Sequence, residues 1–248
     1  IAENVRTCPI VLLSGPSGSG KTTTAMKIAE ALRGMGISSQ SLAMDDYFRT
    51  VNPRTAPRTP EGDIDFESPA CLDMDLLGKH LNALARGEEI HLPRYNFVTR
   101  VQSGPIGRPM RLGKDEVVVC EGIHALNDDI AAYCPDAFRL YISARSVVVD
   151  GDGQEIFKGT WMRLLRRLVR DSNFRGTPAA ATLDMWANVR RGEKRFISPF
   201  KERANLMFDS SFPCEVSIMK NFAAPLLAAV PEGAERYAEI RSLSLIHI

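Results

Sequence analysis

A glycine-rich loop between a predicted strand and a predicted helix limits the fold of this chain more than any other feature. Residues 10–13 form a short apolar run of the kind found in buried parallel strands. The next segment reads GPSGSGKT over residues 15–22, and the apolar residues after it recur at helical spacing as far as Gly34. A strand, a G-x-x-x-x-G-K-T loop and a helix in this order are the setting of a phosphate-binding loop. The sequence therefore predicts an α/β fold that binds a phosphorylated ligand.

This phosphate loop, residues 15–22, offers several kinds of group that can bind phosphate. Its glycines let successive backbone N–H groups face inward as an anion nest, and the helix N-terminus adds partial positive charge. We expect Lys21 to reach the β- and γ-phosphates of ATP and the Thr22 hydroxyl to ligate Mg²⁺. The residues assigned to ATP binding are Gly15, Pro16, Ser17, Gly18, Ser19, Gly20, Lys21, Thr22 and Thr23. A Gly/Ser-rich turn that binds nothing is the alternative, which the correct strand and helix disfavour.

Acidic residues follow two further predicted strands. Residues 117–120 form a second buried-strand run and lead into Glu121, which we expect to hold Mg²⁺ directly or through water. A strand-end acid in solvent is the alternative. The run from residue 39 is interpreted as a strand ending in Asp45 and Asp46. Phosphate transfer to an alcohol needs a carboxylate that orients and deprotonates the hydroxyl, and we favour Asp45 for this role over the alternative that both aspartates are turn residues.

Four arginines share one face of a predicted helix over residues 160–175, and the opposite face is apolar and suited to a core. They are Arg163, Arg166, Arg167 and Arg170. Only Asp171 is at hand to neutralise them, and like charges at this spacing destabilise a helix by roughly 0.2–0.5 kcal/mol per pair. Guanidinium groups match phosphate geometry, so the segment 158–177 is expected to be a lid that closes on the transferring phosphates. A solvated basic face is the alternative.

Six motifs, taken in order, resemble the uridine kinase family of P-loop kinases. They read GPSGSGKTTT, MDDYF, DFESP, LPRYNF, VVVCEGIHAL and RLLRRLVRDSNFRG. The strongest resemblance is to bacterial uridine-kinase-like proteins with N-terminal domains similar to part of threonyl-tRNA synthetase, domains that this chain would then lack. The resemblance runs from about Ile10 to Leu227. It implies ATP- and Mg²⁺-dependent phosphorylation of the 5′-hydroxyl of a nucleoside, above all a uridine-like one.

The resemblance also implies an architecture: a single P-loop kinase domain over residues 1–248, with a parallel sheet flanked by helices. A small acceptor-site insertion is expected at about residues 50–112, followed by the arginine-rich lid. Asp45 matches the catalytic base. Arg167 and Arg170 match lid arginines near the donor phosphates and the acceptor, and Arg175 matches a further lid arginine near ATP.

Six residues are implied to bind the acceptor: Phe66, Glu67, Tyr95, Phe97, Arg100 and Met185. Tyr95 and Phe97 match an aromatic pair beside the nucleobase. Glu67 replaces an aspartate that contacts the ribose hydroxyls and is one methylene longer. Arg100 and Met185 replace the histidine and the glutamine that read the pyrimidine. The pyrimidine preference is therefore less well supported than the transfer of phosphate, and a pantothenate-like or sugar-like alcohol is the alternative acceptor.

Composition limits which classes of partner and function the chain can have. A chain that is 44% hydrophobic, with a net charge of +1, gives no general reason to expect nucleic acid or an anionic membrane as a partner. No apolar run approaches 18 residues, which argues against a membrane span. Five scattered cysteines without a C-x-x-C pair fit the reduced thiols of a cytoplasmic protein. Residues 158–203 hold 12 Lys and Arg against 4 Asp and Glu, so an NTP-binding regulatory or RNA-associated module without turnover is the alternative from another class.

Local patterns predict further elements along the chain. We expect helices at 73–86, 127–133 and 178–190 and from Phe222 onward, strands at 138–142 and 206–208, a hairpin beginning at 89–97, and a flexible loop at 150–159. The final LSLIHI has neither a cap nor a partner and resembles a truncation or a cloning sequence. The oligomeric state is left open.

Overall fold

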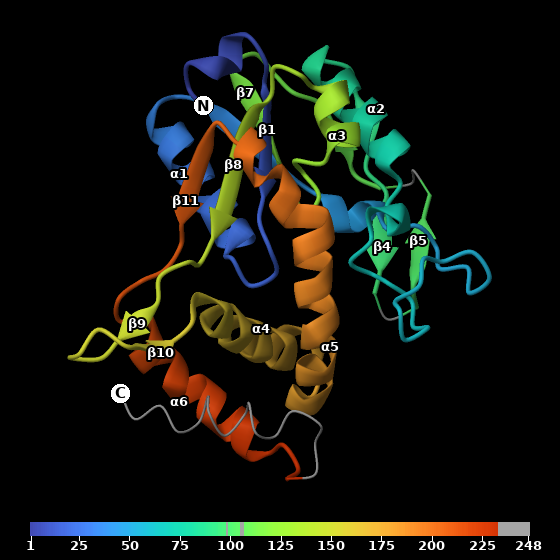
Figure 1. The fold of residues 1–248 in the computed structure, drawn as a ribbon. Helices are drawn as coiled ribbons and strands as arrows, with labels where there is room; N and C mark the ends of the chain where they lie inside the picture. The colour runs from blue at the N-terminus through green and yellow to red at the C-terminus, as the bar shows by residue number, and fades with distance from the viewer. Residues whose placement is uncertain (98, 105–106, 233–248) are drawn as a thin grey trace. The chain divides into compact units, whose positions relative to one another are not determined.

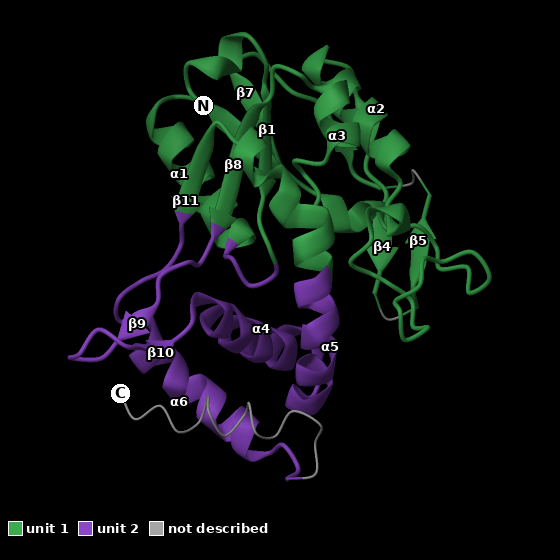
Figure 2. Cartoon of the chain, viewed as in Figure 1, with its two compact units in different colours: residues 1–16, 21–142, 192–208 green, residues 17–20, 143–191, 209–248 purple. Residues whose placement is uncertain are grey.

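The computed structural model describes residues 1–97, 99–104 and 107–232, which divide into two compact units (Figure 2). The first unit comprises residues 1–16, 21–142 and 192–208, and the second comprises residues 17–20, 143–191 and those from 209 onward. The phosphate loop contributes residues to both units, because its apex, residues 17–20, belongs to the second.

A five-stranded sheet forms the centre of the first unit, in the order β11-β8-β1-β7-β2 (Figure 1). Its strands are β1 (Ile10–Ser14), β2 (Ser38–Ala43), β7 (Glu116–Glu121), β8 (Phe138–Ser143) and β11 (Leu206–Asp209). Strand β1 pairs in parallel with β7 and with β8, and β7 pairs in parallel with β2. All five residues of β1 are buried, as expected for a central strand covered on both faces. The predicted parallel α/β fold is confirmed.

Successive residues of the central strands point into two different cores. Leu12 of β1 and Val118 of β7 belong to the larger cluster, which the apolar faces of α2 (Met74–Ala85) and α3 (Asp128–Tyr133) complete. Leu13 of β1 and Val119 of β7 belong to the smaller cluster, together with residues of α1 (Lys21–Gly34). The helices therefore cover both faces of the sheet, as predicted.

Capping side chains define where α2 and α3 begin. The Asp73 carboxylate accepts a hydrogen bond of 3.1 Å from the Leu76 N–H at the start of α2, and Asn127 caps α3. Two short antiparallel pairs lie between α2 and β7 in sequence: β3 (Ile90–His91) with β6 (Pro109–Met110), and β4 (Arg94–Asn96) with β5 (Val101–Ser103). The predicted hairpin region is confirmed. The unit also contains short 3₁₀ helices at residues 4–6, 69–71 and 198–203. A π-helical turn lies at residues 193–197.

The second unit holds three helices among its described residues: α4 (Gly159–Arg175), α5 (Ala179–Gly192, whose last residue belongs to the first unit) and α6 (Glu215–Ala228). Their apolar faces meet in one cluster that includes Leu164, Leu168, Trp186 and Leu227. Gly176 ends α4 in the left-handed conformation with φ of 60°. The predicted helices over 160–175 and 178–190 are confirmed.

Three expectations about element boundaries are wrong. Strand β2 ends at Ala43, so Asp45 and Asp46 lie in a 3₁₀ turn, Met44–Tyr47, whose apolar residues are buried without continuing the strand. The segment 150–159 is not a loop throughout, because β10 (Glu155–Phe157) pairs antiparallel with β9 (Val148–Val149). Helix α6 begins at Glu215, before the predicted position 222.

Four of the five cysteines are buried, and all five are free thiols. The buried ones are Cys8, Cys71, Cys120 and Cys134, and burial raises the pKa of each thiol. Cys214, at the N-terminus of α6, is exposed. Within the described part of the chain, every helix is too short or too polar to cross a bilayer. The terminal LSLIHI lies outside the described residues.

Candidate active site

In the first unit, the lysine of the phosphate loop is held by the loop's own backbone. Lys21 Nζ donates hydrogen bonds of 2.8 Å to the Gly15 carbonyl and 3.3 Å to the Pro16 carbonyl. Lys21 is the first residue of α1, which follows β1 directly through the loop. Its ammonium group therefore lies at the carboxyl end of β1, the edge at which parallel sheets bind ligands.

Thr22 and Glu121, the two residues that the sequence predicts as Mg²⁺ ligands, are in direct contact. Thr22 Oγ1 donates a 2.8 Å hydrogen bond to Glu121 Oε1. The register places Glu121, the last residue of β7, beside Leu13 of β1 on one side and Ala43 of β2 on the other. A hydroxyl and a carboxylate fit a hard divalent cation such as Mg²⁺. Since no group of three or more His, Cys, Asp or Glu in the described residues could hold a metal, the other ligands of such an ion would be water and phosphate oxygens.

Gly122 fixes the distance between this pair and the turn that carries the aspartates. A Cβ atom at Gly122 would lie 2.5 Å from Cβ of Met44, so only glycine lets the end of β7 approach the 3₁₀ turn this closely. Met44 is 1% exposed and directly precedes Asp45. The end of β7, which carries Glu121, and the turn that carries Asp45 are therefore held together by this close packing and by the pairing of β7 with β2.

The two aspartates of the turn have different environments. The Asp45 side chain is exposed, whereas Asp46 is half-buried. Burial raises the pKa of Asp46, and a hydrogen bond to its carboxylate from the Tyr95 backbone partly offsets that increase. Asp46 thus attaches the turn to β4, and Asp45 is the carboxylate left open to a substrate.

Three aromatic rings gather beside this turn. The ring centroids of Phe48 and Tyr95 lie 5.3 Å apart, those of Phe48 and Phe97 5.8 Å apart, and those of Tyr95 and Phe97 4.9 Å apart. Phe97 is 54% exposed, so one face of the cluster is open to a planar ligand. The sequence predicted Tyr95 and Phe97 but missed Phe48, although Phe48 is the last residue of the MDDYF motif.

Arg100 lies over the Phe66 ring from a strained backbone position. Its φ is 57°, in the left-handed region that residues other than glycine rarely adopt. Its guanidinium carbon lies 5.3 Å from the centroid of the Phe66 ring, and the side chain is exposed. Burial raises the pKa of Tyr95, and the positive charge of Arg100 opposes that shift. Tyr95 Oη is buried without a hydrogen-bond partner among the described residues, so a polar group of a ligand could pair with it.

Glu67 packs against the backbone of the segment that returns from α5. A Cβ atom at Gly192 would collide with the Glu67 side chain, so the glycine permits this contact. Nearby, His124 is 2% exposed, and its ring nitrogens approach the backbone of Phe196 and Glu67 without forming hydrogen bonds of ordinary geometry. Burial lowers the pKa of His124 to about 4, so the imidazole is neutral at pH 7. The sequence analysis missed His124, although it lies in the VVVCEGIHAL motif.

In the second unit, the apex of the phosphate loop has the conformation of an anion nest. Gly18 and Gly20 have φ of 75° and 83°, which glycine adopts without strain. Ser19 is fully buried, and its Oγ has no hydrogen-bond partner within the described chain. A buried hydroxyl without a partner fits a ligand that supplies acceptor oxygens, as a phosphate does.

Three arginines of α4 contact this apex. Arg163 Nη1 donates to the Ser17 carbonyl at 3.3 Å, Arg166 Nη1 to the Gly18 carbonyl at 3.1 Å, and Arg167 Nη1 to Ser17 Oγ at 2.8 Å. The expectation that only Asp171 neutralises the arginine stripe is wrong, because Glu215 of α6 forms an ion pair with Arg166. The two are 49 residues apart, so no local pattern could reveal the pair.

Asp171 forms ion pairs with three arginines of α4. Its carboxylate, 2% exposed, lies 3.2 Å from Nε of Arg167, 2.7 Å from Nη2 of Arg170 and 3.7 Å from Nη1 of Arg175. The side chains of Arg170 and Arg175 are 36% and 45% exposed, so both can reach a ligand. One carboxylate with three guanidinium groups leaves a net positive charge, which suits a phosphate.

Met185 lies apart from the other predicted acceptor residues. It is on α5 in the second unit and is 42% exposed, whereas the other five lie in the first unit.

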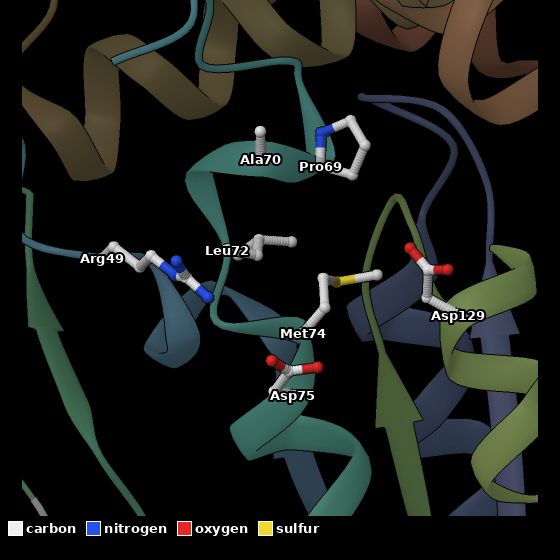
Figure 3. Close-up of a pocket in the computed structure, with 7 residues that line it drawn as sticks. All are labelled: Arg49, Pro69, Ala70, Leu72, Met74, Asp75 and Asp129. Carbon is white, nitrogen blue, oxygen red and sulfur yellow. The ribbon is translucent and has the colours of Figure 1, made fainter. Parts of the chain in front are cut away.

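The first unit also contains a pocket of about 350 Å³ between α2 and α3 (Figure 3). None of the predicted site residues lines it. Its lining residues are Arg49, Pro69, Ala70, Leu72, Met74, Asp75 and Asp129.

Comparisons with known proteins agree with the resemblance. Residues 10–216 match the model of the Phosphoribulokinase / Uridine kinase family. A uridine kinase of Deinococcus deserti is 31% identical over 199 residues, covering 80% of this chain and 86% of that protein. One of Staphylococcus haemolyticus is 28% identical, covering 84% and 91%. A putative fructose transport system kinase from Silicibacter sp. TM1040 shares the fold with a TM-score of 0.56 at 18% identity, covering 84% of this chain and 96% of that one.

Proposed function

The chain belongs to the phosphoribulokinase/uridine kinase family, and on that premise we propose that it is an ATP- and Mg²⁺-dependent kinase that phosphorylates the 5′-hydroxyl of a uridine-like nucleoside. The observation that carries the proposal is the 2.8 Å contact of Thr22 Oγ1 with Glu121 Oε1, at the sheet edge that also carries Lys21 and the turn of Asp45. Metal ligands, a phosphate-binding cation and a free carboxylate are the groups that phosphoryl transfer to an alcohol requires.

Donor binding is assigned to the phosphate loop. Its backbone N–H groups and Lys21 bind the phosphates, and Thr22 and Glu121 would hold Mg²⁺, which supplies charge neutralisation on the phosphate oxygens when it is bound. The partnerless Ser19 Oγ supports this assignment. Arg170 and Arg175, held by Asp171 and partly exposed, are assigned to the charge that develops on the transferring group.

The acceptor is assigned to the aromatic cluster of the first unit. A planar base stacks on Tyr95 and Phe97, and the Glu67 carboxylate accepts hydrogen bonds from the ribose hydroxyls. Asp45 takes the proton from the acceptor hydroxyl as its oxygen forms a bond to the γ-phosphorus. The bond between that phosphorus and the bridging oxygen breaks, and ADP leaves with the electron pair.

The test is ADP release from ATP and Mg²⁺ across a panel of nucleosides, sugars and pantothenate. Turnover with uridine is the expected result. Turnover only with a non-nucleoside alcohol would show that the acceptor is a pantothenate-like or sugar-like alcohol instead. ATP binding without turnover on any member of the panel would favour the regulatory NTP-binding module instead.

Paired variants test the base. Asp45→Asn is nearly isosteric, so it should still bind both substrates and lose about 10²–10⁴ in turnover. Asp46→Asn is the matched control from the same turn, and it should lose stability more than turnover, because its carboxylate attaches the turn to β4. The reverse pattern would assign the base to Asp46.

A further inference from the structure

We propose that Arg163 and Arg166 are positioning residues that hold the phosphate loop in its phosphate-binding form, and that Glu215 holds Arg166 in place for this task. The inference rests on the proposed function, because it concerns how the same loop binds ATP. It gives two arginines of the stripe a role other than contact with a transferring phosphate.

The geometry of two peptide groups supports this role. Arg163 donates to the Ser17 carbonyl and Arg166 to the Gly18 carbonyl. Both peptide bonds are trans, so each N–H points opposite to its carbonyl. Binding the two carbonyls on the helix side therefore turns the N–H groups of Gly18 and Ser19 the other way, as an anion nest requires.

Arg166 has no donor left for a phosphate. Its Nε and Nη2 donate to the two carboxylate oxygens of Glu215 at 2.5 and 2.6 Å. Nη2 also donates to the Ser210 carbonyl at 2.8 Å, while Nη1 donates to Ser210 Oγ and to the Gly18 carbonyl, both at 3.1 Å. A guanidinium group has five N–H donors, and these contacts use all of them. The side chains of Arg166 and Glu215 are 15% and 14% exposed, so the arrangement is largely shielded from water.

The loop also touches the backbone of α4 directly. A Cβ atom at Gly18 would collide with the carbonyl oxygen of Arg163. The Arg163 side chain is 1% exposed, and its guanidinium carbon lies 5.8 Å from the Trp186 ring centroid. Arg163 is thus fixed by the core of the second unit, in contrast to the partly exposed Arg170 and Arg175.

The variant Glu215→Gln tests whether Arg166 positions the loop or contacts phosphate, because the two roles change the Kd for ATP in opposite directions. If Arg166 positions the loop through the Gly18 carbonyl, loss of the Glu215 charge lets the loop leave its binding form and raises the Kd for ATP, by about 10-fold if the competent form drops to a tenth. If Arg166 instead contacts phosphate, freeing it from Glu215 tightens ATP binding. Calorimetric titration with ATP and Mg²⁺ decides, and an unchanged or lowered Kd overturns the proposal. Glu155→Gln, an exposed acid of β10 in the same unit, is the matched control and should leave the Kd unchanged.

Kinetic constants and a second variant distinguish a change in loop position from a loss of folded protein. The KM for ATP should rise in Glu215→Gln with kcat within about twofold of wild type, because the loop form affects binding before the transfer step. Arg166→Lys keeps the charge but not the five donors, and it should raise the Kd in the same direction. A kcat loss at unchanged KM in both variants overturns the inference while leaving the proposed function intact. Failure of the wild-type chain to bind ATP overturns the proposed function itself.

Discussion

Ser17 Oγ accepts a 2.8 Å hydrogen bond from Arg167 Nη1, which joins a side chain of the phosphate loop to an arginine of α4. The same guanidinium group lies 3.2 Å from Asp171 through its Nε, and its side chain is 10% exposed. Arg167 is therefore ordered by the protein itself, whereas Arg170 and Arg175 keep exposed surface. Helix α4 thus contains arginines of two kinds, which their spacing in the sequence alone does not distinguish.

The contact between Ser17 and Arg167 should appear as an energetic coupling. In a double-mutant cycle of Ser17→Ala and Arg167→Met, we expect a coupling of about 0.5–3 kcal/mol in the free energy of unfolding, because each change removes the same hydrogen bond. Urea unfolding of the four proteins measures it. The cycle of Ser17→Ala with Arg175→Met is the control and should be additive. Additivity in both cycles would mean that the Ser17 contact contributes nothing.

Gly18→Ala should damage the phosphate loop more than a comparable glycine elsewhere. Gly18 and Gly87 have φ of 75° and 74°, so alanine is strained by the same backbone effect at both positions. Only at Gly18 would the new Cβ collide with a neighbour, since no atom lies within 4 Å at Gly87. Thermal shift with and without ATP should therefore show lost ATP stabilisation in Gly18→Ala and full ATP stabilisation in Gly87→Ala. Equal behaviour of the two would contradict the close contact with α4.

His124 should make the protein sensitive to acid. Its pKa is about 4 in the folded chain, below the ordinary value of 6.5, so between these values the unfolded chain binds more protons. The stabilisation is present above pH 6.5 and is lost as the pH falls toward 4. From pH 7 to pH 5, the wild type should lose about 2 kcal/mol more than His124→Gln, which cannot titrate. Denaturant unfolding at both pH values measures the difference, and equal losses would show that burial does not keep the imidazole neutral.

Arg100 should favour uridine over cytidine. A guanidinium group only donates, so it pairs with the O4 carbonyl of uridine and not with the 4-amino group of cytidine. The ratio of kcat/KM for the two nucleosides should favour uridine by about 10–100-fold, the range expected for a charged hydrogen bond. Arg100→His, which can both donate and accept, should reduce this ratio. A ratio of one, or one that favours cytidine, in the wild type would refute the assignment.

Elements with strong local signals were predictable. The strands β1 and β7 are continuous apolar runs, and α1 starts at a glycine-rich loop and ends beside Gly34. The end of β2 was not predictable, because Met44 and Tyr47 look like strand residues and are buried by a 3₁₀ turn instead. Strand β10 was missed because its partner β9 lies outside the glycine-rich segment that dominates the local pattern.

In the candidate site, too, the residues with a local sequence signal were predictable and the contacts that depend on tertiary packing were not. Lys21, Thr22 and Glu121 were singled out from motifs at strand ends, and the structure joins Thr22 and Glu121 by a hydrogen bond. The pair of Arg166 with Glu215 and the approach of Phe48 to Tyr95 depend on tertiary packing between distant segments, which no local spacing encodes. Contact with RNA and the presence of synthetase-like N-terminal domains stay predictions from the sequence.

The unequal exposure of the five thiols makes Cys214 a natural attachment point. A maleimide dye applied to the folded protein would react there, since the other four cysteines are buried and their raised pKa values keep them protonated. Cys214 directly precedes Glu215, the partner of Arg166. The unaltered chain therefore carries its own site for a fluorescent label, one residue from the ion pair between Arg166 and Glu215.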